Sequence, residues 1–295
     1  MKKSLLILII LFISIQAKSQ AGTYYYGANG KLIRQEADAY VMKSVSKGIG
    51  DRFKISTKVR LNNNEWLFFS TEKIEIKNRE LHIIKSVGNT LIPGKSTRKI
   101  ENLGNRKYRV EDFKIDQLFR TADCSRLIPL HYEGMVTEYY DNGNKKSESL
   151  YKENMLQSNK NWYPDGTPYI DNIFYSTHTG PTYPGGNDGI QNFISDRIAD
   201  EKLPSRAIVD EIIIGAVVME TGTLDGIKII YGSQPSVNEI FIKALKELPE
   251  AWGPATFDGE KVRYFIQLPF FLKNNVATLQ KFEITKDGIM ILLNE

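Results

Sequence analysis

The chain has 295 residues, of which 41% are hydrophobic and 25% are charged. This composition is typical of a globular protein with one or two cores, and it excludes a disordered or collagen-like chain. The single cysteine, Cys124, cannot form an intrachain disulfide, and one cysteine with three histidines cannot make a Cys/His zinc cluster. We therefore expect no metal site, no cofactor and no thiol-rich redox chemistry.

Residues 1–19 have the pattern of a secretory signal peptide. Two lysines precede an apolar run from Leu5 to Ile15, and Ala17-Lys18-Ser19 places small residues where a signal peptidase cleaves. The run is shorter than the ~20 residues that span a bilayer. We predict cleavage and a location in the periplasm or cell envelope, and the alternative is an uncleaved leader that anchors the chain in the inner membrane. Cleavage leaves a net charge of +1, which argues against nucleic-acid binding.

Residues 20–125 predict antiparallel β-strands. Apolar and polar residues alternate over 53–59, 73–77 and 80–84, and Asn- and Gly-rich segments separate these runs. The glycines of Lys47–Asp51 lack the third glycine and the helix start of a dinucleotide-binding loop, so we interpret this segment as a hairpin turn.

Residues 126–178 contain a short repeat. Tyr139-Tyr140-Asp141-Asn142-Gly143 recurs 23 residues later as Trp162-Tyr163-Pro164-Asp165-Gly166, and residues 24–31 form a looser copy with one extra residue. Aromatic residues followed by Asn-Gly or Asp-Gly predict β-hairpins, because glycine takes positive φ at little steric cost. The pattern resembles MORN-type repeats of the antitoxin-like variant. Aromatic stacking along the hairpins is the simplest role for these residues.

Residues 181–273 change pattern after a Pro- and Gly-rich boundary. Helical periodicity follows Asn187 or Asp188 as a predicted cap, and Ser236 with Glu239 predicts a capping box for a second helix. Three strands are expected, at Glu211–Met219, Ile227–Tyr231 and Val262–Leu268, the last one ended by Pro269. The predicted fold class is therefore α+β: an N-terminal antiparallel β region with MORN-like hairpins, then two helices on a small three-stranded antiparallel sheet. Residues 274–295 are a C-terminal extension.

An ordered set of short motifs in this region resembles the C-terminal domain of TonB. The set comprises Tyr183-Pro184-Gly185-Gly186, Leu203-Pro204-Ser205-Arg206-Ala207, Gly215, Gly222, Trp252-Gly253-Pro254-Ala255, Gly259, Val262 and Pro269. The resemblance implies a module that binds an extended segment of an envelope protein, such as an outer-membrane receptor, by adding a strand to its sheet. An edge strand suits this task because its main-chain N–H and C=O groups are unpaired. The predicted partner-binding strand comprises Val262, Arg263, Tyr264, Phe265, Ile266, Gln267 and Leu268.

Two departures from TonB argue against energy transduction. A transducer needs a membrane-embedded N-terminal helix and a long spacer, whereas this leader is short and the 11 prolines are scattered along the chain. We therefore predict partner binding as the main function and a link to TonB-dependent transport as an additional role. The alternative function is a structural or cell-wall-associated adaptor that uses the domain for self-association, as a homodimer.

Charge is divided unevenly along the chain. Residues 20–180 carry a net charge of +6 and residues 181–273 carry −4. The basic region suggests an anionic envelope polymer as a ligand, contact between the two regions, or simply a solvated surface. The chain has no Gly-x-Ser-x-Gly or His-Glu-x-x-His motif, and Cys124 is expected to be an inert thiol. We predict that the protein is not an enzyme and has no small-molecule substrate; a hydrolase of envelope polymer is the remote alternative.

Overall fold

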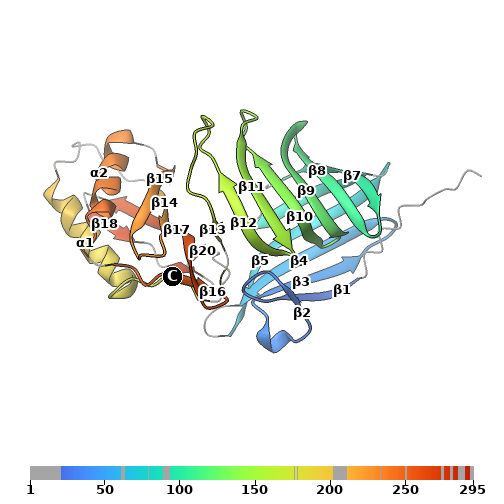
Figure 1. Cartoon of the computed structure of the whole chain (residues 1–295), viewed down its shortest axis with the longest axis horizontal. Coiled ribbons are helices and arrows are strands. Elements are labelled where there is room, and N and C mark those ends of the chain that lie inside the picture. Colours follow the sequence, from blue (N-terminus) through green and yellow to red (C-terminus); the bar gives the residue numbers. More distant parts are fainter. Residues whose placement is uncertain are drawn as a thin grey trace, which may run out of the picture.

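The structure is a computed structural model of the whole chain (Figure 1). It describes residues 21–60, 64–78, 80–88, 94–175, 177, 179–201, 211–232, 234–249, 251–273, 276–279, 282–284 and 290–292. The predicted signal peptide, residues 1–19, lies outside the described residues. Of the predicted C-terminal extension, three short segments are described.

One antiparallel sheet of twelve strands forms the first unit, with strand order β12-β11-β10-β9-β8-β7-β6-β5-β4-β3-β1-β2. The strands are β1 (Gly22–Tyr26), β2 (Leu32–Ile33), β3 (Val41–Lys47), β4 (Arg52–Arg60), β5 (Trp66–Lys77), β6 (Glu80–Gly88), β7 (Ser96–Gly104), β8 (Lys107–Lys114), β9 (Gln117–Leu127), β10 (Leu130–Tyr139), β11 (Lys145–Lys152) and β12 (Met155–Asn161). A 3-10 turn at Glu36–Asp38 separates β2 from β3. From β3 onward, each strand pairs with the next one in the chain.

The alternation in the sequence explains these strands. In β4, Phe53, Ile55 and Val59 are buried while Lys54 and Lys58 are exposed, as expected for side chains that point alternately to the two faces of a sheet. The predicted hairpin turn at Lys47–Asp51 is confirmed, because β3 and β4 pair from Lys47 and Phe53 onward. The inward-facing residues of the sheet form one core.

The twelve-stranded sheet curls until strands from its two ends touch. The Arg126 guanidinium on β9 donates to the Tyr26 hydroxyl on β1 at 3.1 Å, and the Asn154 amide donates to the Gly30 carbonyl at 2.8 Å. Figure 1 shows the blue strands β1 to β5 passing behind and below the green strands. This curvature brings residues more than 100 positions apart to the two sides of one interior.

Three turns of the sheet share one geometry. In each, a glycine amide donates to the carbonyl three residues earlier: Gly30 to Gly27, Gly143 to Tyr140, and Gly166 to Tyr163. The glycines have φ of 81°, 84° and 86°, a region that other residues avoid. The first copy of the repeat therefore has no extra residue, because Gly27 takes the position of Tyr140. The predicted hairpin turns are confirmed at these three places.

The second unit contains two helices and a smaller sheet, in which β13-β17-β14-β15 lie in that order while β16 and β18 also pair with β17. The elements are β13 (Ile173–Phe174), α1 (Gly186–Asp200), β14 (Glu211–Val218), β15 (Leu224–Tyr231), α2 (Pro235–Lys246), β16 (Ala255–Phe257), β17 (Glu260–Lys273) and β18 (Val276–Leu279). A separate pair consists of β19 (Phe282–Ile284) and β20 (Met290–Leu292).

Both helices pack on one face of this sheet and build its core. Ile190, Ile194 and Ile198 of α1 are fully buried, which matches the one-turn spacing of a helix face. The predicted capping residues are not used: α1 begins after Gly185 in a left-handed conformation, and neither helix has a side-chain cap hydrogen bond. Pro235 in the first turn of α2 instead supplies a backbone already suited to a helix start.

The predicted fold class is wrong in its architecture. The chain is mostly β, and the described residues of 22–161 make one twelve-stranded sheet that includes most of the predicted repeat region. The second unit is not a TonB-like domain of two helices on three strands, because its curled sheet contains six strands. Two sequence interpretations caused the error. Residues 173 and 174 were assigned to the MORN-like repeats, whereas they form β13 of the second sheet, and Pro269 was predicted to end a strand that continues to Lys273.

Candidate partner-binding edge

The predicted partner-binding strand, Val262–Leu268, lies within β17 and is not the free edge of its sheet. Strand β14 pairs with β17 along one side, from Tyr264 to Phe271. On the other side, β13 pairs in parallel with Arg263 and Tyr264, and β18 pairs from Phe270 onward, while β16 pairs with Glu260–Val262 at the beginning of the strand. Between β13 and β18, residues 265–269 of β17 have no described strand on that second side. The expectation of an open border is therefore wrong for residues 263 and 264.

The side chains of this strand are also occupied. Tyr264, Ile266 and Leu268 point into the core beneath the helices and are at most 1% exposed. The Arg263 guanidinium forms an ion pair with Glu220 at 3.0 Å and donates to the Asp171 carbonyl at 2.9 Å. These contacts give the strand a structural role in joining the sheet to the segment before β13.

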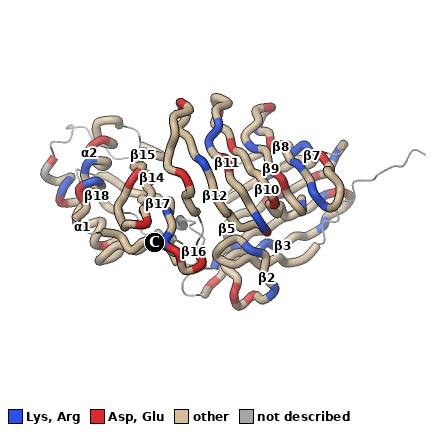
Figure 2. Tube along the Cα trace, viewed as in Figure 1, with Lys and Arg blue, Asp and Glu red and all other residues tan. Residues whose placement is uncertain are grey.

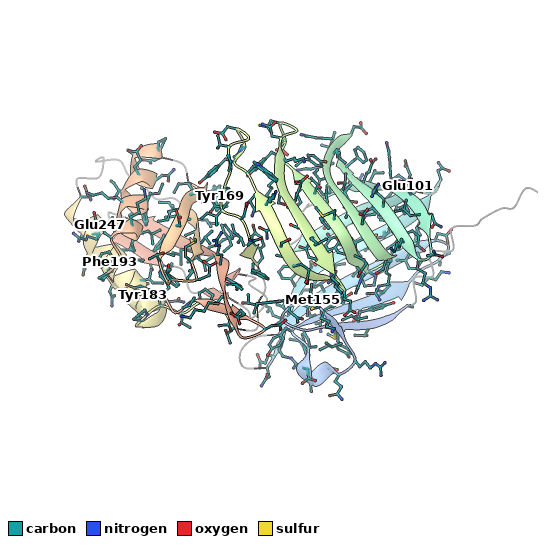
Figure 3. All side chains as sticks on the ribbon, viewed as in Figure 1. Glu101, Met155, Tyr169, Tyr183, Phe193 and Glu247 are labelled. Atoms are coloured by element: carbon teal, nitrogen blue, oxygen red, sulfur yellow. The ribbon has the colours of Figure 1, made fainter. Side chains whose placement is uncertain are left out.

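The free edge of the smaller sheet is β15. It pairs with β14 on one side, and none of the described strands pairs with its other side. The Tyr169 hydroxyl donates to the Gly226 carbonyl at 2.7 Å, which covers the beginning of the strand. Figure 3 shows Tyr169 between the first unit and β15. The accessible part of the edge therefore runs from Ile227 to Tyr231.

This edge carries exposed apolar side chains on the face away from the helices. Ile230 and Tyr231 are 46% and 57% exposed, and Phe271 of β17 is 39% exposed. Gly215 of β14 lies under Ile230 and the ring of Phe265, and a β-carbon at this glycine would stand 2.6 Å from that ring. Because Gly215 has no side chain, the side chains of Ile230 and Phe265 can both lie over it, one from each neighbouring strand. The result is a small apolar surface beside an unpaired strand, which we call the β15 edge (Ile227–Tyr231).

One basic group lies in this surface. The Lys228 ammonium stands 4.2 Å from the ring centre of Tyr169 and 5.4 Å from that of Phe265, so two aromatic rings stabilise its charge. No carboxylate of the described residues lies within ion-pair distance of it. Burial lowers the pKa of Lys228, and the positive charge of Lys146 lowers it further. An acidic group brought to the β15 edge would relieve both effects.

Charge elsewhere does not point to a nucleic-acid surface. Figure 2 shows basic and acidic residues interspersed along both units. The predicted inert character of Cys124 is supported, since the thiol is 1% exposed and burial raises its pKa to about 12. Within the described ranges, His, Cys, Asp and Glu side chains form no group of three that could hold a metal ion.

The sequence did not identify β15 as the edge. Its Ile-rich run predicts the returning strand of a hairpin with residues 211–219, and such a pattern does not specify strand order. The only available signal was Lys228 amid apolar residues, since a lysine on an edge strand is a common protection against aggregation.

Comparison with known proteins gives no further guide. No protein-family model, no curated protein and no solved structure matches this chain. The resemblances to MORN repeats and to the TonB family stay predictions, and the function rests on the geometry of the molecule itself.

Proposed function

We propose that this is a non-enzymatic binding protein of the cell envelope that captures an extended segment of a partner protein by adding it to the β15 edge. The single observation that carries the proposal is an unpaired strand end, Ile227–Tyr231, flanked by exposed apolar side chains and a lysine without a counter-ion. Main-chain hydrogen bonds to an added strand supply affinity, and the side chains beside them supply selectivity.

The chemistry of the edge defines the partner segment. Ile230, Tyr231 and Phe271 favour apolar side chains at alternate positions of the added strand. Lys228 favours an acidic residue among them, because its ammonium is half-buried and near Lys146. The occupant is therefore an extended acidic–apolar segment of another protein.

Self-association through the same edge is the alternative function. A symmetric dimer joined at β15 would bring the Lys228 ammonium groups of two copies to one seam, and like charges across a strand pair are destabilising. This repulsion favours a separate partner. Light scattering of the purified chain distinguishes the two, since a homodimer would show twice the monomer mass.

Location in the envelope is the part of the proposal that depends on the leader. The signal pattern of residues 1–19 supports export, although that segment is not described structurally. None of the helices in the described ranges has both the length and the apolar composition needed to span a membrane.

Two peptides test the binding proposal directly. One is a ten-residue peptide that alternates valine with glutamate, and the other replaces each glutamate by lysine. We expect the acidic peptide to bind the full chain and the basic peptide to bind at least about tenfold more weakly, a difference of roughly 1.4 kcal/mol. Lys228→Glu should remove this preference. Lys99→Glu is the matched control, because Lys99 is an exposed β7 lysine that also lies over an aromatic ring, that of Phe113.

Equal binding of the two peptides, or an unchanged preference in Lys228→Glu, would reject the proposed edge. A preference lost equally in Lys99→Glu would assign it to overall charge and would reject the edge as well.

A further inference from the structure

A cavity of about 250 Å³ lies at the junction of the two units. Its wall comes from distant parts of the chain, including Lys43 of β3, Tyr132 of β10, Tyr151 of β11, Asn154, Tyr175 and Phe257 of β16. Met155, the residue after Asn154, marks this place in Figure 3. The volume is near the lower end for small-molecule sites and suits a ligand the size of one ring.

The cavity is held in shape by contacts of its own wall. The Asn154 side chain accepts from the Tyr132 amide at 3.0 Å and donates to the Gly30 carbonyl at 2.8 Å. Lys31 and Glu153 form an ion pair at 3.3 Å at the same junction. The first turn of the sheet is thus tied to the turn between β11 and β12, so the site is formed before any ligand arrives.

Lys43 gives the cavity an unmatched positive charge. Its ammonium lies 5.4 Å from the ring centre of Tyr26, and it has no ion pair with a carboxylate of the described residues. Burial lowers the pKa of Lys43, Glu72 opposes this effect, and Arg126, Arg120 and Arg98 reinforce it.

The nearby carboxylates do not neutralise this set of cations. The Asp112 carboxylate is already bound by the guanidinium groups of both Arg98 and Arg120. Glu138, which also acts on Arg120 and the cavity tyrosines, already pairs with Lys146 at 3.6 Å. Lys43, Lys146 and three arginines therefore stand near three acidic groups, Asp112, Glu72 and Glu138, in an interior that water screens poorly. An anion that enters the cavity gains from this excess.

Three tyrosines complete the site. The rings of Tyr132 and Tyr151 lie 5.0 Å apart, and Tyr175 and Phe257 add two further aromatic rings. The hydroxyls of Tyr132, Tyr151 and Tyr175 form no hydrogen bond with another described residue. Burial raises the pKa of both Tyr132 and Tyr151, so these phenols stay protonated and can donate at neutral pH. Aromatic faces suit a ring, while the hydroxyls suit its polar substituents.

We infer that this cavity binds a small ring-bearing carboxylate, with the carboxylate against Lys43 and the ring among Tyr132, Tyr151 and Tyr175. Two sources share this chemistry: an acidic sugar, such as a uronate unit of an envelope polymer, and an aromatic acid. The site is separate from the β15 edge, and its occupation does not depend on strand addition.

Titration calorimetry on the full chain at low salt tests the inference. The probes are galacturonate and benzoate, with galactose and benzyl alcohol as their neutral counterparts. We expect at least one acid to bind with a Kd of about 1 mM or tighter and its neutral counterpart to bind at least about tenfold more weakly. Whichever acid binds identifies the source of the ring.

Two lysine variants locate the charge. Lys43→Met should weaken binding of the acid at least about tenfold, whereas Lys99→Met on β7 should leave it unchanged. Lys43→Arg keeps the positive charge and should retain binding. This variant still tests the role of the charge if Lys43→Met fails to fold. Tyr175→Phe, at a half-exposed ring, should weaken binding about threefold by loss of one hydrogen bond.

Absence of binding by both acids up to about 20 mM would overturn the inference, since an affinity that weak falls below that of a specific site. Acids that bind no better than their neutral counterparts would also overturn it. A Lys43→Met variant that folds and binds as the unaltered chain does would overturn it too, as would a folded Lys43→Arg variant that has lost binding.

Discussion

Asn159 and Ile173 are joined by two hydrogen bonds that connect the two sheets of the molecule. The Asn159 amide donates to the Ile173 carbonyl, and its oxygen accepts from the Ile173 amide at 3.1 Å. Asn159 lies on β12, the edge strand of the twelve-stranded sheet, while Ile173 begins β13, which pairs with β17. The Asn159 side chain thus makes the two main-chain hydrogen bonds that a neighbouring strand would otherwise make with Ile173. This junction fixes the position of the second unit on the first.

Replacing Asn159 by leucine removes both bonds while keeping a similar volume. Because the N–H and C=O of Ile173 would then be buried without partners, we expect a loss of about 2–4 kcal/mol in the free energy of unfolding. Urea denaturation measures it. Gln157→Leu, at an exposed site of the same strand, should change stability by less than about 0.5 kcal/mol. Equal effects of the two substitutions would contradict the structural role of Asn159.

The buried cluster of Asp112, Arg98 and Arg120 predicts a pH-dependent stability. The two guanidinium groups outweigh burial and lower the pKa of Asp112 to about 2. A lowered carboxyl pKa stabilises the folded state above the unfolded value near 4, and this contribution is lost as the pH falls toward 2. Asp112→Asn should cost about 3–5 kcal/mol at pH 7 by urea denaturation.

The difference between the unaltered protein and Asp112→Asn should shrink by about 2 kcal/mol between pH 5 and pH 2. Asp123→Asn is the control, because Asp123 pairs with Arg109 near the surface, and it should cost less than about 1 kcal/mol. A pH-independent difference for Asp112→Asn would show that its carboxylate is not held ionised by the arginines.

The repeated turns predict a graded response to alanine. Gly143 has φ of 84° with open space around it, so Gly143→Ala should cost about 1–2 kcal/mol from backbone strain alone. Gly30 has the same conformation, but a β-carbon there would stand 2.9 Å from the Asn154 carbonyl oxygen. Gly30→Ala should therefore cost more than Gly143→Ala in thermal or urea unfolding. If Gly30→Ala is the milder substitution, the contact between the first turn and Asn154 is absent in solution.

Cys124 should be unreactive in the folded protein. Its thiol is buried and its raised pKa, about 12, leaves almost no thiolate at pH 8. A colorimetric thiol reagent should react with one thiol per chain in denaturant and with essentially none in buffer. Fast reaction under native conditions would show that β9 opens to solvent.

Much of the secondary structure could be predicted from the sequence. The strand around Phe53, the turns at Asn142-Gly143 and Asp165-Gly166, and the helix that buries Ile194 all follow from local periodicity or from the conformational freedom of glycine. These features depend on residues that are close together in the chain, so short segments of the sequence are enough to predict them.

The order of the strands could not be predicted, because it depends on contacts between residues that are far apart in the sequence. The edge assigned to Val262–Leu268 failed because β13, two residues long, pairs with it across about 90 positions of sequence. The curl of the large sheet, which brings Lys43 near Tyr132, is likewise set by long-range contacts such as Arg126 with Tyr26. A periodicity of two identifies a strand but does not specify its neighbours.

Hydrogen exchange of the full chain with and without the valine–glutamate peptide tests the central claim, that β15 accepts an added strand. An added strand should slow amide exchange within Ile227–Tyr231 and leave Val262–Leu268 of β17, which does not receive the peptide, unchanged. We expect this localised protection with the unaltered chain, and we expect its loss in Lys228→Glu. Protection that appears in β17 but not in β15, or in neither strand while the peptide is bound, would contradict it.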